Sequence, residues 1–382
     1  MTPRERLRLT FEGKKADRIP VSPFIWCNNI YEMFDYTPTI EDNLFPDPEE
    51  FDLATKFIEY NEHFGFDVLH SSGLLWDKYI PPTSENWEVS IEKQGDDDKE
   101  VRTTTVNTPD GELKQVMKFS RSSQYLIVFA VQEYLIKTKK DFEILAKYIP
   151  PAKFIDCGFI QRAKEAIGDK GLINPASHGV FNTLNQFRKL DDMMIDPIND
   201  EGFYREMMEF MLRWNADHLK EVVKAGSDSI ELGANLATSD VGPAFFTEFV
   251  ADYENRLSKE VHNMGAYVVY HNCGDAQKIM HLYNDLDIDV WGYVTGPPFG
   301  DVILDDVLKV IRPDMALRGN IDQVEFLVKA TPEEIKERVK KLYEKVKPRG
   351  NWILSCSDFF FDGTSYDNIF AFAKAGIENG KY

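Results

Sequence analysis

The sequence is poor in cysteine, in long hydrophobic runs and in clustered positive charge. Four cysteines in 382 residues are too few for a disulfide-stapled fold. The most apolar stretch, Tyr125 to Ile136, contains Gln132 and Glu133 and is too short to span a bilayer. With 44 lysines and arginines against 64 acidic residues, the net charge is −20. These features argue against a disulfide scaffold, a membrane protein and a nucleic-acid-binding protein.

The N-terminal sequence and the composition indicate a folded protein with reduced thiols. Residues 1–6 lack the apolar core of a signal peptide, so we expect a cytoplasmic protein. Reduced cysteines in that compartment are free to bind metal. A hydrophobic fraction of 43% can fill a sizeable core.

Short apolar runs that alternate with helix-like spacing predict βα units along most of the chain. Eight such runs are present, the number that a closed barrel needs. They cover residues 19–24, 66–70, 171–175, 227–232, 266–270, 288–294, 315–318 and 351–355. No Gly-x-Gly-x-x-Gly follows the first run, which argues against a doubly wound open sheet. We therefore predict an α/β fold, a (β/α)8 TIM barrel, as a single catalytic domain over residues 1–382.

Residues 87–119 break this rhythm. Short β-prone runs there are separated by two turn sequences, Gln94-Gly95-Asp96 and Thr108-Pro109-Asp110-Gly111. The pattern predicts an antiparallel β meander inserted into the barrel. Covering the barrel mouth and forming a homodimer contact are both open roles for it.

Potential metal ligands follow three of the predicted strands. In a parallel barrel the working residues lie at the C-terminal ends of the strands. His271 and Cys273, two residues apart, can present imidazole and thiolate on one side of an extended segment, and Cys356 ends the last strand. Such a set suits Zn²⁺ with one position open, for which Glu231 is a candidate. The alternative is that these cysteines are ordinary core residues.

Other candidates for the pocket come from the same predicted rim. His178 follows a predicted strand, and Asp358 lies two residues beyond Cys356. Either is a candidate catalytic residue for proton transfer. Aromatic and amide side chains could wall the pocket and bind substrate. These are Trp26, Asn28, Phe359 and Phe360.

The sequence resembles the uroporphyrinogen decarboxylase superfamily over nearly its whole length. The segments that carry the resemblance are residues 2–6, 15–21, 225–233, 271–274, 319–322 and 331–334. The resemblance implies a (β/α)8 barrel. It also implies one of two chemistries, a cofactor-free decarboxylation or a cobalamin (corrinoid)-dependent methyl transfer.

Two features favour the methyltransferase branch of the superfamily. The decarboxylases have an arginine-rich N-terminal segment, whereas residues 23–30 here contain no arginine. The corrinoid-dependent enzymes hold zinc with a His-x-Cys pair and a distant cysteine, a pattern that His271, Cys273 and Cys356 match. The resemblance thus implies Zn²⁺ as cofactor and a separate corrinoid protein, carrying Co(I), as methyl acceptor.

The methyl donor is a small molecule whose identity the pattern leaves open. Trp26, Trp76 and residues 359–361 favour an aromatic methyl ether, because aromatic rings stack well in such a wall. One alternative is transfer involving a thiol such as coenzyme M, or another simple methyl donor. The other is a metal-free lyase or binding barrel of the same fold.

Overall fold

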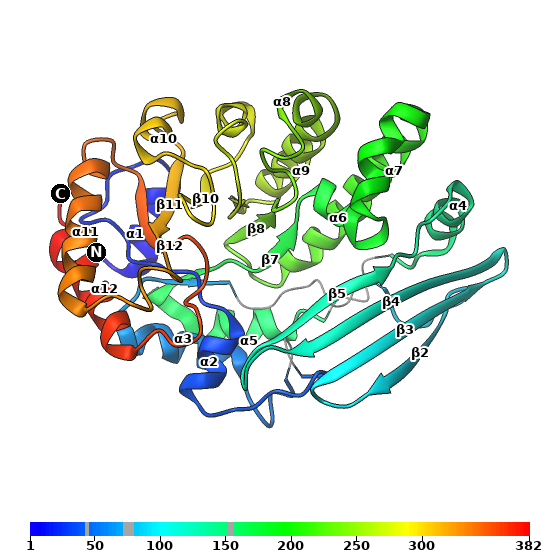
Figure 1. The fold of residues 1–382 in the computed structure, drawn as a ribbon, viewed down its shortest axis with the longest axis horizontal. Helices are drawn as coiled ribbons and strands as arrows, with labels where there is room; N and C mark the ends of the chain where they lie inside the picture. Colours follow the sequence, from blue (N-terminus) through cyan, green and yellow to red (C-terminus); the bar gives the residue numbers. More distant parts are fainter. Residues whose placement is uncertain (43–45, 72–79, 152–155) are drawn as a thin grey trace.

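The structure, a computed structural model, describes residues 1–42, 46–71, 80–151 and 156–382. Its centre is a ring of parallel strands surrounded by helices (Figure 1). Six strands pair side by side in the order β12-β11-β10-β9-β8-β7. Their bounds are β7 Ala176–His178, β8 Ser229–Gly233, β9 Tyr267–His271, β10 Val290–Val294, β11 Ala316–Ile321 and β12 Trp352–Cys356.

Two further strand positions close the ring. Strand β1 (Val68–His70) pairs in parallel with β6 (Gly171–Ile173), and β6 continues directly into β7. On the other side, Val21 forms a parallel bridge to Leu354 of β12 while its carbonyl accepts a hydrogen bond from Asp67. Counting β6 and β7 as one position, the ring has eight members, so the predicted (β/α)8 barrel is confirmed.

The helices cover the outside of the ring and one end of it (Figure 1). Helix α11 begins at Thr331, whose hydroxyl and the Glu334 carboxylate form a capping box, as the Thr-Pro-Glu-Glu sequence predicts. A kink at Asp200, three residues beyond Pro197, interrupts α7. The helices are α1 Pro3–Phe11, α2 Cys27–Met33, α3 Leu53–Phe64, α4 Lys139–Tyr148, α5 Gly158–Ile167, α6 Val180–Phe187, α7 Leu190–Lys224, α8 Pro243–Phe245, α9 Ala251–Asn263, α10 Leu304–Val310, α11 Pro332–Val346 and α12 Tyr366–Asn379.

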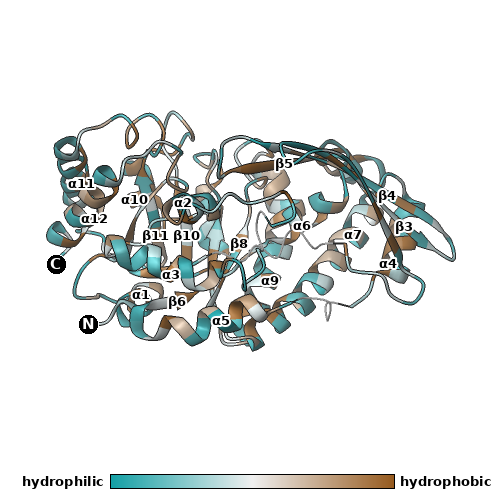
Figure 2. Ribbon diagram, turned by 90° about the horizontal axis from the view of Figure 1, so that it is seen from below, coloured by the Kyte–Doolittle hydropathy of each residue, from teal (hydrophilic) through white to brown (hydrophobic). Residues whose placement is uncertain are grey.

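The predicted meander is a four-stranded antiparallel sheet that lies beside the barrel, over α6 and α7 (Figure 2). It extends beyond the predicted range 87–119, because β5 adds a fourth strand that the search for turn sequences missed. Gln115 donates to the carbonyl of Gln186 at the end of α6, which ties the sheet to the barrel helices. The strands are β2 Glu88–Gly95, β3 Lys99–Thr108, β4 Gly111–Arg121 and β5 Ile127–Glu133.

The inside of the barrel changes from apolar to polar along its axis. Leu7 and Phe11 of α1 close the N-terminal end and pack against inward-facing residues of six strands. Those residues are Leu69, Leu172, Val269, Val290, Ala316 and Ile353. One layer further toward the C-terminal end, Glu231 and Arg318 are buried with exposures of 1% and 0%. Buried charges of this kind need partners, so the polar layer is where function is expected.

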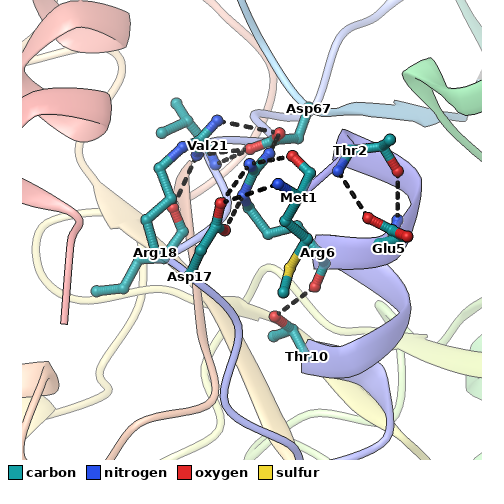
Figure 3. A network of polar contacts seen from close by, with 10 residues as sticks. Met1, Thr2, Glu5, Arg6, Thr10, Asp17, Arg18, Val21 and Asp67 are labelled. Carbon is teal, nitrogen blue, oxygen red and sulfur yellow. Dashed lines mark hydrogen bonds and ion pairs between the residues drawn. The ribbon is translucent and has the colours of Figure 1, made fainter.

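The N-terminal segment is held by a buried ion-pair network centred on Asp67 (Figure 3). Arg6 and Arg18 both contact the Asp67 carboxylate, which also accepts the Val21 amide at 2.8 Å. Arg4 pairs with Asp228, joining α1 to the segment before β8. Arg4, Arg6 and Arg18 therefore anchor α1 and the segment after it, which close the N-terminal end of the barrel.

None of the helices that the structure describes has both the length and the apolar character needed to cross a membrane.

The network predicts a large loss of stability for Asp67→Asn. The substitution leaves two guanidinium groups without their buried counter-charge, which costs about 3–5 kcal/mol of unfolding free energy. Urea unfolding followed by circular dichroism measures it. The control is Asp17→Asn, since Asp17 also pairs with Arg6 but is 42% exposed and should cost about 1 kcal/mol or less. Equal effects would contradict the role given to Asp67.

His262 predicts a stability change with pH. Hydrogen bonding to Asp289, whose carboxylate also accepts the Val268 amide, raises the pKa of His262 to about 9. A raised folded-state pKa stabilises the protein fully below the unfolded value of about 6.5, and the contribution disappears as pH rises through 9.

We expect about 1–2 kcal/mol of unfolding free energy to be lost between pH 6.5 and 9, after allowance for solvent screening. Urea titrations across this range measure it. In His262→Gln the difference from wild type should shrink as pH rises, and a constant difference would contradict the assignment.

Candidate functional site

The C-terminal end of the barrel brings together a carboxylate, an imidazole and a thiol from neighbouring strands. Glu231 on β8 accepts a hydrogen bond from His271 Nδ1 on β9 at 2.6 Å. This bond leaves Nε2 as the outward-facing nitrogen, and within the described chain Nε2 is buried and has no hydrogen-bond partner. Cys273 interacts with the same imidazole. The bond to Glu231 thus orients the ring, and Nε2 is the nitrogen left to bind a metal ion once its proton is lost.

Electrostatics hold the Glu231 and His271 pair in its ionised form. Burial alone would raise the pKa of Glu231, but the hydrogen bond from His271 and the charges of His271 and Arg318 lower it overall. Burial would likewise lower the pKa of His271, yet its contacts with Cys273 and Glu231 raise it to about 10. A metal ion at Nε2 would replace that proton.

Glu231 contacts the Nδ1 side of His271, and the expectation that it is a fourth ligand stays a prediction. One oxygen bonds His271, and the other accepts from Asn174 Nδ2 at 2.8 Å and lies 3.5 Å from Arg318 Nη1. Both oxygens are therefore already engaged, as in the carboxylate–histidine pairs that orient metal ligands.

Cys356 does not join His271 and Cys273 in this structure. Ile353 of β12 faces the inside of the barrel, and by the alternation of strand side chains Cys356 faces the opposite way, into the main core cluster. Among the residues described, no three His, Cys, Asp or Glu side chains lie close enough together to hold a metal ion. Sequence periodicity had placed Cys356 at the rim without deciding its face.

The two candidate proton-handling residues differ in what they can do. Asp358 lies in the loop after β12, where it interacts with Cys273 and accepts the Phe359 amide at 2.8 Å. Burial raises the pKa of its carboxyl group. Burial lowers the pKa of His178 to about 3, helped by the nearby His271. Burial therefore favours the neutral imidazole of His178, and its role in the reaction stays a prediction.

Aromatic rings form one wall of the mouth. The rings of Trp26 and Phe359 stack with centroids 6.2 Å apart, and Phe24 lies 5.7 Å from Trp26. Phe24 also meets the His271 ring edge to face at 5.5 Å. The predicted residues Trp26 and Phe359 thus pack around Phe24, and Phe24 is the ring that contacts the imidazole. Trp76 falls outside the described residues.

Two predicted substrate-binding residues have other positions. Phe360 is 1% exposed and packs against Phe66 and Phe372, so it is a core residue rather than part of the pocket wall. Asn28 donates its amide to Asp362 and links α2 to the loop after β12. In a run of three phenylalanines the sequence could not show which ring faces the mouth.

The sequence reasoning missed Arg318 and Tyr293. Arg318 is fully buried, and its guanidinium lies 4.5 Å from the centroid of the Tyr293 ring. Tyr293 in turn meets the His271 ring at 4.8 Å. The signal that could have identified Arg318 is its position as a charged residue directly after the apolar run Met-Ala-Leu of a predicted strand.

Comparison with known proteins assigns the family. Residues 159–378, more than half of the chain, match the model of the family described as Uroporphyrinogen decarboxylase (URO-D). The chain belongs to the uroporphyrinogen decarboxylase family. The match contains Glu231, His271, Cys273 and Arg318, while the antiparallel sheet lies outside it.

Three known proteins are similar to this chain. A methylated-thiol–coenzyme M methyltransferase from Methanosarcina mazei is 24% identical over 141 residues, which are 37% of this chain and 35% of that protein. A methyltransferase structure from Methanosarcina mazei covers 99% of both chains with a TM-score of 0.69 and 16% identity. A B12-independent methionine synthase from Shewanella sp. W3-18-1 covers 95% of this chain and 96% of its own, with a TM-score of 0.52 and 12% identity. At these identities the two structures support the fold alone.

The positions of neighbouring phenylalanines predict opposite mutational effects. Phe360→Ala removes a buried ring and should lower the unfolding free energy by about 3–5 kcal/mol. Phe359 lies at the partly exposed mouth of the barrel. Phe359→Ala should therefore lower the unfolding free energy by about 1 kcal/mol or less, and it should weaken the binding of aromatic ligands. Urea unfolding and ligand titration measure the two effects. A pocket defect in Phe360→Ala at unchanged stability would contradict this assignment.

Proposed function

We propose that this protein is a zinc-containing methyltransferase that moves a methyl group from a small methylated donor to the Co(I) corrinoid of a separate protein. The observation that carries the proposal is His271, whose Nδ1 is bound by Glu231 while its buried Nε2 has no partner in the described structure and lies beside Cys273. The partial match to a methylated-thiol–coenzyme M methyltransferase supports the same reaction class.

The residues fit a zinc ion held by His271 Nε2 and the Cys273 thiolate. An imidazole and a thiolate are ligands that zinc prefers, and the carboxylate behind the imidazole is the usual orienting partner. Asp358, which interacts with Cys273, is one candidate for the third ligand. Cys356, predicted from the sequence, is the other, and it would have to turn from the core toward Cys273 to bind. When bound, zinc would stabilise the negative charge that develops on the heteroatom losing its methyl group.

Residues around His271 would bind the donor and supply a proton. Phe24, Trp26 and Phe359 would hold a planar donor against the imidazole. Asp358, with its raised pKa, could hold a proton at the departing oxygen. The aromatic wall is the observation that favours an aromatic methyl ether, and hence O-demethylation. A thiol substrate is the second candidate, favoured by the named substrate of the relative.

The first test is the zinc content of the purified protein. We expect about one zinc per chain, lost in His271→Ala and Cys273→Ser because each removes a ligand. The matched control is Cys157→Ser, since Cys157 contacts the Glu221 carbonyl on α7 instead. Elemental analysis gives the metal content, and the absorbance of a Co(I) corrinoid protein reports methyl transfer.

Cys356→Ser and Asp358→Asn then decide the third ligand, which is the one whose loss lowers zinc affinity. No zinc in the wild type, even after reconstitution, would overturn the proposal and return the chain to the metal-free lyase alternative.

A further inference from the structure

Four neighbouring strands present alternating glycines and basic side chains at one level of the barrel. The register pairs Gly233 with His271, His271 with Gly292, and Gly292 with Arg318. A Cβ atom added at Gly292 would meet nothing closer than 3.6 Å, and its neighbours there include Arg318 Cδ. Gly292, which has no side chain, therefore leaves space for a small group between Val269 and Arg318.

Arg318 has hydrogen-bonding capacity that none of the described residues uses. Its Nε donates to the Ser22 carbonyl at 3.1 Å, and its Nη1 makes a single long contact of 3.5 Å with Glu231. Its Nη2 is buried and has no partner among the described residues. Glu231 gives its shorter bonds to His271 and Asn174, so the positive charge of Arg318 is only partly matched.

Tyr293 adds a second unused group at the same place. Its ring lies against both the Arg318 guanidinium and the His271 imidazole. Its hydroxyl is buried, and none of the described side chains or backbone groups bonds it. Buried polar groups without partners are rare, and two on residues in mutual contact indicate a site for a ligand's polar group.

We propose that Arg318 and Tyr293 form an anion-binding subsite beside His271 in the upper half of the barrel. It takes the carboxylate or sulfonate of a small monoanionic molecule, whose apolar part lies along the Phe24, Trp26 and Phe359 wall. The net charge of −20 disfavours the binding of anions on the rest of the protein surface. Anion binding is therefore expected at Arg318 rather than on that surface. That this ligand is the methyl donor or a thiol rests on the proposed function, whereas anion binding itself does not.

Matched pairs of charged and neutral probes test the subsite. The first pair is 4-methoxybenzoate and 4-methoxybenzyl alcohol, and the second is 3-mercaptopropionate and 3-mercapto-1-propanol. Isothermal titration should show at least 10-fold tighter binding of the anion in one pair, because a charged hydrogen bond to a buried guanidinium is lost in the alcohol. The pair that shows the preference identifies the substrate class.

Variants of Arg318 and Tyr293 test whether these residues cause the preference for the anion. In Arg318→Gln the two members of the pair should bind within about 2-fold of each other, and Tyr293→Phe should weaken the anion several-fold while leaving the alcohol unchanged. Arg338→Gln is the control, because Arg338 lies in a separate outer pocket of about 550 Å³ and should keep the full preference. If Arg318→Gln fails to fold, Arg318→Lys and Tyr293→Phe carry the test.

Equal binding of anion and alcohol by the wild type overturns the subsite, as does a preference that is undiminished in both Arg318→Gln, or Arg318→Lys in its place, and Tyr293→Phe. Zinc is measured on the same samples, so the two proposals fail separately. An anion preference in a zinc-free protein removes the metal proposal alone, and a zinc-containing protein without the preference removes the subsite alone.

Discussion

The buried carboxylate of Glu231 organises the upper half of the barrel. It lies between His271 and Arg318, and each of these basic groups would be costly inside the barrel without it. The carboxylate sets which imidazole nitrogen is available, and it keeps the guanidinium within the barrel without occupying all of its donors. The geometry of the imidazole and the unused capacity of Arg318 therefore have one physical origin.

The barrel has an apolar N-terminal half and a polar C-terminal half, and Glu231, His271 and Arg318 lie where the two meet. Its N-terminal half is filled by apolar residues and closed by Leu7 and Phe11 of α1. Its C-terminal half carries the polar groups, with Cys273 and Asp358 at the partly exposed rim. Charge interactions are strong at the boundary between these halves because the apolar floor keeps the local dielectric constant low.

The segments that resemble the family divide into structural and site-forming parts. Arg4, Arg6 and Arg18 bind Asp228 and Asp67 beneath the barrel and hold α1 and the segment after it in place. Thr331 and Glu334 cap α11. By contrast, Glu231 and His271 meet only at the mouth. The resemblance in the N-terminal arginines is therefore evidence for the fold. Only the resemblance in the strand-end residues is evidence for the chemistry.

The sequence by itself determined the eight-membered barrel, the capped start of α11 and the strand ends at which polar residues collect. These features follow from local periodicity and turn chemistry, which each segment carries within its own residues. The tertiary structure decided which face each strand-end residue presents. It turned Cys356 and Phe360 toward the core, placed Glu231 behind His271, and brought Arg318 and Tyr293 into the site. Those outcomes depend on the register between strands distant in the chain, and a shift of one residue reverses the face of every side chain.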